Sequence, residues 1–169
     1  KVSYTDNEGF SSGEITTSEQ NIYFSVADNT TDGITASVGS GDDLLIGSKN
    51  NDSLEGLGGA DEIHGGEGND TLEGGTGNDT IYGGAGNDRI IGGAGVDTIY
   101  GGDGNDNISV GIGNYGFNDD GESSIQLVDA GAGDDYIEGR DNQKILAGDG
   151  NDTITGGFSY LDAGAGDDS

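Results

Sequence analysis

The chain has 169 residues, of which 33 are acidic and only 5 are Lys or Arg, so its formal net charge at pH 7 is −28. This charge argues against nucleic acid and anionic membranes as partners, because both require basic patches, and it favours cations. Glycine accounts for 37 residues, large apolar residues are sparse and cysteine is absent, which excludes a thick-cored globule and any disulfide.

Residues 1–37 differ in composition from everything that follows, since they are richer in Ser, Thr and aromatic residues. The apolar run at 22–26 predicts a strand. Solenoids end in atypical units, so we interpret 1–37 as an N-terminal β cap or as the tail of a preceding domain. No segment of the chain resembles a signal peptide or a membrane span.

A nine-residue repeat begins at residue 38, is imperfect up to residue 64 and is regular over 65–109. Residues 65–100 read GGEGNDTLE, GGTGNDTIY, GGAGNDRII and GGAGVDTIY. We number the positions from the first glycine, so that position 6 is aspartate and position 8 is apolar. Such strict repetition predicts a repeat architecture. Position 6 is Asp43, Asp52, Asp61, Asp70, Asp79, Asp88, Asp97 and Asp106, and position 8 is Leu45, Leu54, Ile63, Leu72, Ile81, Ile90, Ile99 and Ile108.

The period predicts a β-solenoid. Positions 7–9 are expected to form a three-residue strand whose middle side chain points inward, and positions 1–6 to reverse the chain with glycines at positive φ. Two repeats then make one coil, and stacked coils make two parallel sheets ~10 Å apart. The inward columns are expected to be Leu45, Ile63, Ile81 and Ile99 on one sheet, and Leu54, Leu72, Ile90 and Ile108 on the other.

The repeat degenerates at 110–129 and 139–146, but its phase is expected to persist, with Phe117 and Ile125 at apolar positions. Acidic turns return with Asp135, Asp152 and Asp168, which are spaced by nearly the length of one coil, whereas the turns opposite them read GRDNQK and GGFSYL. We therefore predict one continuous roll over 38–169 that stops within a repeat at residue 169.

The turns are the expected source of stability, because a core of single aliphatic columns hardly offsets the backbone entropy lost on folding. An aspartate and several glycine-turn carbonyls form an all-oxygen site, which suits Ca²⁺ better than Mg²⁺, while zinc would need Cys or more than one His. Aspartates one coil apart are expected to pair on one edge and share an ion. The pairs are 43/61, 52/70, 61/79, 70/88, 79/97, 88/106, 135/152 and 152/168.

These repeats resemble the RTX (repeats-in-toxin) calcium-binding nonapeptide, GGxGxDxUx. The resemblance implies an all-β, right-handed parallel β-roll (a β-solenoid) with two sheets of short strands and about six to eight Ca²⁺ ions in its turns. It also implies that positions 2, 4 and 6 of one turn share an ion with positions 1, 3 and 6 of the turn two repeats later.

The ligands implied by this scheme are carbonyls at positions 1–4 and the carboxylate at position 6. They are Gly39, Gly41, Asp43, Asp52, Gly56, Gly58, Asp61, Gly65, Gly66, Glu67, Gly68, Asp70, Gly74, Gly75, Thr76, Gly77, Asp79, Gly83, Gly84, Ala85, Gly86, Asp88, Gly92, Ala94, Asp97, Gly101, Asp103, Asp106, Gly131, Gly133, Asp135, Ala147, Gly148, Asp149, Gly150, Asp152, Ala163, Ala165 and Asp168. Weaker binding is expected where Ser48, Asn50 and Leu57 replace glycine and where Tyr115 replaces aspartate.

The resemblance further implies a structural module of a larger secreted bacterial protein, located outside the cell or at its surface. Its expected partners are calcium ions, the other domains of the parent protein and the type I secretion machinery that exports it. The module is expected to fold on extracellular Ca²⁺ and to insert into no membrane. Neither a catalytic residue nor a cofactor other than Ca²⁺ is predicted, since chance accounts for carboxylate pairs in so acidic a chain.

The alternative function is that of an adhesin or a substrate-recognition module that uses an outer sheet face. His64, Tyr82 and Tyr100 are one coil apart and are expected to stack there, although a cross-strand packing ladder is the favoured explanation. An ice-binding surface would need a regular row of Thr or Asn. Position 3 gives no such row, because it reads Glu67, Thr76, Ala85, Ala94 and Asp103.

Overall fold

The computed structural model describes residues 3–5, 23–25, 33–112, 126–140 and 143–169. Within these ranges the chain forms strands and turns but no helix, and hence no helix that could span a membrane. The strands are β1 Ser3–Thr5, β2 Tyr23–Ser25, β3 Thr35–Ser37, β4 Leu44–Ile46, β5 Ser53–Gly58, β6 Glu62–Glu67, β7 Thr71–Thr76, β8 Thr80–Ala85, β9 Arg89–Ala94, β10 Thr98–Asp103, β11 Asn107–Ile112, β12 Gln126–Ala132, β13 Tyr136–Gly139, β14 Gln143–Asp149, β15 Thr153–Gly156 and β16 Tyr160–Asp162.

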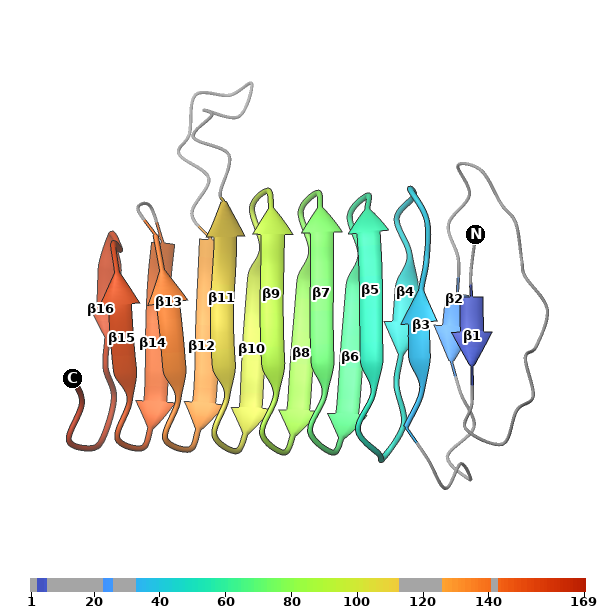
Figure 1. The fold of residues 1–169 in the computed structure, drawn as a ribbon. Coiled ribbons are helices and arrows are strands. Elements are labelled where there is room, and N and C mark those ends of the chain that lie inside the picture. The colour runs from blue at the N-terminus through green and yellow to red at the C-terminus, as the bar shows by residue number, and fades with distance from the viewer. Residues whose placement is uncertain (1–2, 6–22, 26–32, 113–125, 141–142) are drawn as a thin grey trace.

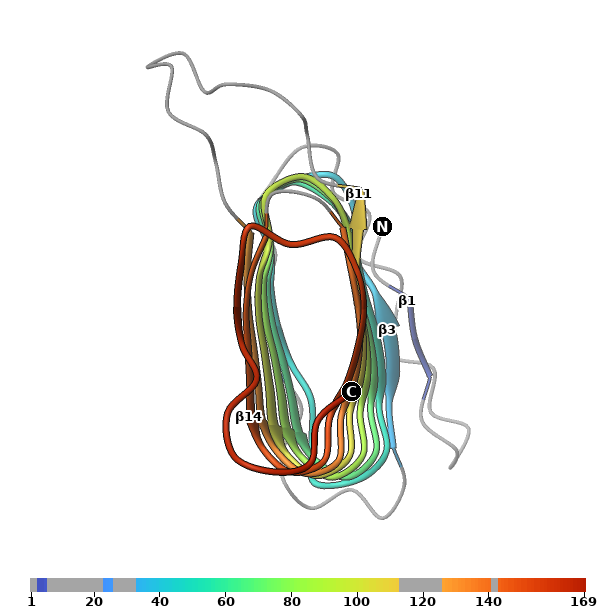
Figure 2. The same cartoon turned by 90° about the vertical axis from the view of Figure 1, so that its left-hand side faces the viewer.

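Two eight-stranded sheets form the walls of a flattened coil, as predicted for a parallel β-roll (Figures 1 and 2). The odd-numbered strands make one sheet and the even-numbered strands make the other, each in sequence order. All pairs are parallel except β1 with β3, which is antiparallel. The predicted strand at 22–26 is present as β2. Since β2 and β3 already pair in parallel with β4 and β5, the cap-to-roll boundary at residue 38 stays a prediction.

The strands of the regular repeats are six residues long rather than three, so the predicted strand length was wrong. In β7, the strand covers positions 7–9 and continues through positions 1–3 of the next repeat. The reason is that stacked coils present their glycine backbones to one another: the amide of Gly77 donates to the carbonyl of Ala94 on the next coil at 2.8 Å. Backbone groups that are paired between coils extend the sheet, and only positions 4–6 are left to turn.

The core contains the two predicted columns, whose eight residues are at most 1% exposed. The even-numbered sheet continues its column from Ile99 to Val128, and the odd-numbered sheet continues from Ile108 to Ile137. Phe117 and Ile125, which we expected at these apolar positions, lie outside the described residues, and the prediction that the phase persists was wrong, because 29 residues separate Ile99 from its neighbour Val128 instead of 18. Because Val128 and Ile137 fill the positions next to Ile99 and Ile108, residues 113–125 connect β11 to β12 between two adjacent coils.

Candidate metal centre at the turns

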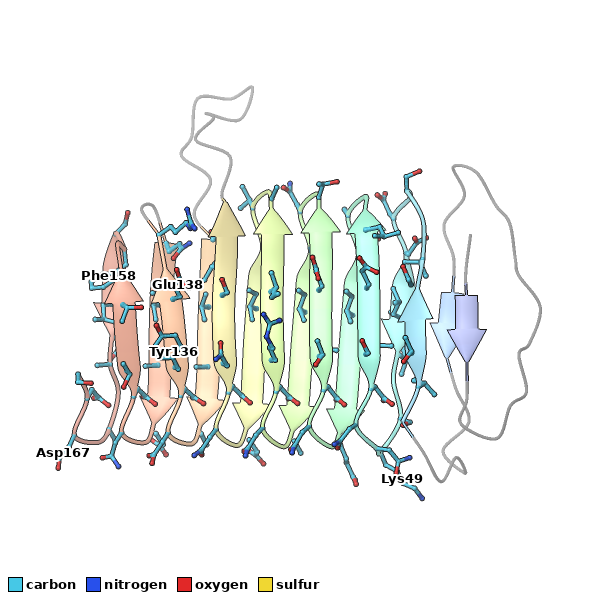
Figure 3. All side chains as sticks on the ribbon, viewed as in Figure 1. Lys49, Tyr136, Glu138, Phe158 and Asp167 are labelled. Carbon is cyan, nitrogen blue, oxygen red and sulfur yellow. The ribbon has the colours of Figure 1, made fainter. Side chains whose placement is uncertain are left out.

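The turns line up along two edges of the roll. We call the edge where even-numbered strands pass to odd-numbered ones the lower edge, after its place in Figure 1, and the other the upper edge. Lys49 and Asp167, labelled in Figure 3, mark the lower edge near its two ends. The lower edge carries Asp52, Asp70, Asp88, Asp106, Asp135, Asp152 and Asp168, and the upper edge carries Asp43, Asp61, Asp79 and Asp97.

The aspartates of successive coils are joined by a ladder of hydrogen bonds along each edge. The amide of Asp52 donates to Oδ1 of Asp70 at 2.7 Å, and that of Asp70 donates to Oδ1 of Asp88 at 2.8 Å. The same bond links all eight predicted aspartate pairs. It also links the amide of Asp106 to Asp135 at 2.7 Å, a pair that the sequence did not reveal because the long connection at 113–125 interrupts the spacing.

The second carboxylate oxygen, Oδ2, is where the turns differ from an ordinary buried network. In most of these aspartates it is fully buried and accepts no hydrogen bond from any described residue. Burying a polar atom without a partner costs free energy, and native structures leave few such atoms. The aspartates concerned are Asp61, Asp70, Asp79, Asp88, Asp97, Asp106, Asp135 and Asp152.

In the six of these turns whose position 1 is glycine, Oδ2 shares a small space with a backbone carbonyl from the next coil, whereas alanine stands at position 1 of the Asp135 and Asp152 turns. The space is the one that a Cβ on the position 1 glycine would fill: a Cβ built on Gly92 lies 2.6 Å from Oδ2 of Asp97 and 2.7 Å from the carbonyl oxygen of Val110. Gly65 stands in the same relation to Asp70 and Gly83. The structure thus brings together the position 6 carboxylate and the position 1 carbonyl two repeats on, as the implied ligand scheme requires.

Other implied ligands take part in bonds between coils. The position 3 carbonyl of Ala85 accepts a hydrogen bond from the amide of Gly68 at 2.8 Å, and that of Asp103 accepts one from Gly86. A carbonyl oxygen has a second lone pair, so this bond leaves room for a cation. Among the described residues no three acidic or histidine side chains meet at one point. The oxygen donors of a site are therefore mostly backbone carbonyls, which hard cations such as Ca²⁺ accept.

Burial makes the ionised form of these carboxyls unfavourable when no cation is present. It raises the pKa of Asp61, Asp70 and Asp106 from 3.8 to about 7, and those of Asp97 and Asp135 to about 6. In each case the hydrogen bond from the preceding aspartate's amide lowers the pKa, and neighbouring carboxylates raise it further. A bound cation would remove this penalty, so the donor set fits a divalent metal.

One turn satisfies its aspartate without any ion. In the turn over residues 47–52, Ser48 replaces the position 2 glycine, its amide donates to Oδ2 of Asp52 at 2.5 Å, and its hydroxyl donates to Oδ1 at 3.1 Å. Both oxygens of Asp52 therefore have protein donors, which agrees with the expectation of weaker binding at this turn. Leu57, another residue that replaces glycine, is held at a positive φ of 70°, a conformation that glycine adopts more easily.

Position 5 has a role that the sequence reasoning missed. Its Asn or Asp side chain accepts a hydrogen bond from the position 5 amide of a neighbouring coil. On the lower edge, Asn51, Asn69 and Asn87 each accept such a bond at 2.8 Å. The recurrent Asn before each aspartate was the available signal. These exposed ladders fix the spacing of the turns from outside, while the aspartates do so from within.

Replacing Gly74 with Ala is expected to damage the site and the stacking together. The new methyl would press against Oδ2 of Asp79 and lie 2.6 Å from the carbonyl oxygen of Gly92. Overpacking at this position is expected to cost about 1–3 kcal/mol, since the turns of Asp135 and Asp152 accommodate a methyl at position 1 in Ala130 and Ala147 but the Asp79 turn is built around glycine. Chemical denaturation with calcium present measures the loss, and Ala85→Ser, at the exposed end of β8, is the matched control. Equal stability of the two variants would show that the space beside Asp79 is not confined.

Comparison with known families gives one result. The family model described as the RTX calcium-binding nonapeptide repeat matches four times, at residues 37–72, 64–99, 82–115 and 120–143, which together make up more than half of the chain. The chain belongs to the RTX repeat family. A search of curated proteins and a search of solved structures each give no match. The protein is thus an RTX calcium-binding β-roll, and the turns with unpartnered aspartate oxygens are those that carry the position 6 aspartate of the nonapeptide motif.

The outer face of this RTX roll carries the predicted aromatic column. The rings of His64 and Tyr82 stack with centroids 4.6 Å apart, and those of Tyr82 and Tyr100 stack at 4.9 Å. His64 also contacts Glu62 at the surface, with 2.7 Å between Nε2 and Oε1. The rings therefore pack against one another, as expected of a cross-strand ladder. Recognition of a glycan or a protein through this face stays a prediction.

Proposed function

We propose that this RTX roll is a structural module that folds when its turns bind extracellular calcium. The observation that carries the proposal is the set of buried Oδ2 atoms without a hydrogen-bond partner, which recurs from Asp61 to Asp152. In a metal-free roll each of these oxygens is a cost, and in a calcium-bound roll each is a ligand. The ion thus supplies what the thin aliphatic core and the glycine-rich backbone lack.

Each ion is held between two turns that lie one coil apart. Both turns supply their position 6 carboxylate. The first turn adds its carbonyls at positions 2 and 4, and the second adds its carbonyls at positions 1 and 3. This scheme rests on the family resemblance and is supported by the aspartate ladder and by the shared space beside each position 1 glycine. About six to eight ions fit the aspartate pairs. Because each ion joins two coils and each coil completes the next site, binding should be cooperative.

The biological setting follows from this coupling. A ligand that binds only the folded state shifts the folding equilibrium toward it. In a cytoplasm poor in calcium the chain would stay unfolded and competent for export through a type I system, and it would fold once outside, where calcium is millimolar. The roll would then act as a rigid, non-catalytic module of a larger secreted or cell-surface protein, beside that protein's other domains. The high negative charge supports this order of events, since it disfavours compaction until cations bind.

Far-ultraviolet circular dichroism during a calcium titration tests the proposal. We expect an unfolded spectrum in chelator and a cooperative transition to β structure as calcium approaches millimolar concentration, with no transition in magnesium at the same concentration. Magnesium is the matched control, because it demands a tighter octahedral site and retains its water. A β spectrum of full amplitude in chelator would refute calcium-coupled folding and leave the unpartnered oxygens to be explained in another way.

A further inference from the structure

Two buried glutamines occupy aspartate positions on the upper edge. Leu127 is paired with Thr98, so Gln126, the first residue of β12, stands in register with Asp97, which precedes β10. Gln143 is paired with Gln126 on the next coil. The two side chains are 3% and 0% exposed, as buried as the aspartates. Glutamine is rarely buried so completely without a structural reason.

The amide groups of these glutamines are joined to each other and to the turns on either side. Nε2 of Gln126 donates to the carbonyl of Gly95 at 2.7 Å, and Nε2 of Gln143 donates to Oε1 of Gln126 at 2.7 Å. Oε1 of Gln143 accepts a hydrogen bond from the amide of Arg140 at 2.7 Å. The chain of bonds therefore runs across three successive coils, and neither glutamine leaves its oxygen without a donor.

We call the hydrogen-bonded pair of Gln126 and Gln143 the glutamine seam. Its chemistry is complementary to that of the aspartate turns. In an aspartate turn, a buried oxygen and carbonyls face one another, and only an added cation can satisfy them. In the glutamine seam, the amide NH₂ is itself the electropositive group, and it donates to Gly95, a position 4 carbonyl of the kind that the ligand scheme gives to an ion. The hydrogen bond between Gln126 and Gln143 joins two neutral amides, so neither of these two side chains brings a charge that opposes the stacking of its coil.

We propose that Gln126 and Gln143 determine where the calcium column of the upper edge stops. The last ion on that edge is one held by Asp97, and the coils beyond it are joined there by side-chain amide hydrogen bonds in place of an ion. The lower edge keeps its aspartates through Asp135, Asp152 and Asp168, so calcium holds the C-terminal coils along one edge only. This inference rests on the proposed function, since it presumes that the aspartate turns bind calcium.

Counting the bound ions by native mass spectrometry of the calcium-saturated protein tests the inference. Gln143→Met keeps the size of the side chain and removes the amide. We expect the variant to hold as many ions as the wild type and to melt about 4–8 °C lower, because the acceptor on Gln126 and the amide of Arg140 lose their partner. Asp70→Asn, in a regular aspartate turn, is the matched control and should hold at least one ion fewer.

Loss of an ion in Gln143→Met would overturn the inference, since it would mean that the glutamine turn itself holds calcium. If that variant does not fold, Gln143→Glu gives a second test: it restores a buried oxygen in place of the amide and is expected to hold one ion more than the wild type. An unchanged or lower count would show that the amide does not stand in place of an ion. A wild-type protein that binds no calcium would refute the proposed function itself. That outcome differs from a failure of this inference alone, in which the wild type binds calcium but the glutamine variants give the wrong ion counts.

Discussion

In the presence of a chelator, acidification from about pH 8 to about pH 5 is expected to convert the calcium-free chain from coil to β structure. The cause is the burial that raises the pKa of Asp61, Asp70 and Asp106 to about 7 and those of Asp97 and Asp135 to about 6, against 3.8 in the unfolded chain. A proton, like a calcium ion, removes the charge from the buried oxygen.

The direction follows from proton linkage. Between the unfolded pKa and the raised folded pKa, the folded state binds more protons than the unfolded state, so stability increases as pH falls and is lost as pH rises through 6 to 7. Circular dichroism against pH in chelator measures the transition. Asp106→Asn should shift its midpoint, whereas Asp103→Asn, at an exposed position 3, should leave it in place. A chain that remains unfolded at pH 5 would contradict the expectation.

With saturating calcium the pH dependence is expected to reverse. Protons then compete with the ion for the same carboxylate oxygens, so calcium affinity should fall as pH decreases toward the raised pKa values. The two titrations together distinguish site-specific protonation from a general loss of surface charge. A general loss of charge would favour the compact state whether or not calcium is bound.

The features of the roll that depend on strict repetition could be predicted from the sequence. The two aliphatic columns and the aspartate pairing required only that nine residues advance the chain by half a coil, so Ile63, Ile81 and Ile99 had to align. Strand length could not be predicted in this way. Glycines at positions 1 and 2 suggest a turn by their conformational freedom, yet in the roll their backbones pair with the coil beside them.

Other features depend on single side chains and not on the period. The pairing of Asp106 with Asp135 is hidden because residues 113–125 change the spacing. The turn at 47–52 departs from the motif at Ser48, but the sequence does not show that the Ser48 amide would satisfy Asp52. Likewise, Gln126 and Gln143 look like members of degenerate turns, and only their register and burial show that they replace aspartates. Local hydrogen-bond partners, more than the motif, therefore decide which turns depend on an ion.

The same principle predicts that Asp79→Asn has opposite effects in calcium and in chelator. In Asp79→Asn, Oδ1 still accepts the amide of Asp61, which lies 2.9 Å away in the wild type, and an NH₂ group replaces the unpartnered Oδ2 beside the Gly92 carbonyl. The variant should hold fewer ions and lose about 1–3 kcal/mol of stability in saturating calcium. In chelator it should be more folded than the wild type, because a buried charge has been replaced by a hydrogen-bond donor.

Asp79→Ala separates this effect from simple removal of charge. Alanine also lacks the carboxylate, but it leaves the amide of Asp61 without an acceptor, which is expected to cost a further ~1–3 kcal/mol. This variant should therefore be less folded than Asp79→Asn in chelator and less stable than the wild type in calcium. The folded fraction in chelator and the calcium midpoint, both followed by circular dichroism, give the comparison. If Asn and Ala behave alike in chelator, the amide does not replace the ion, and the dependence on calcium arises from charge alone.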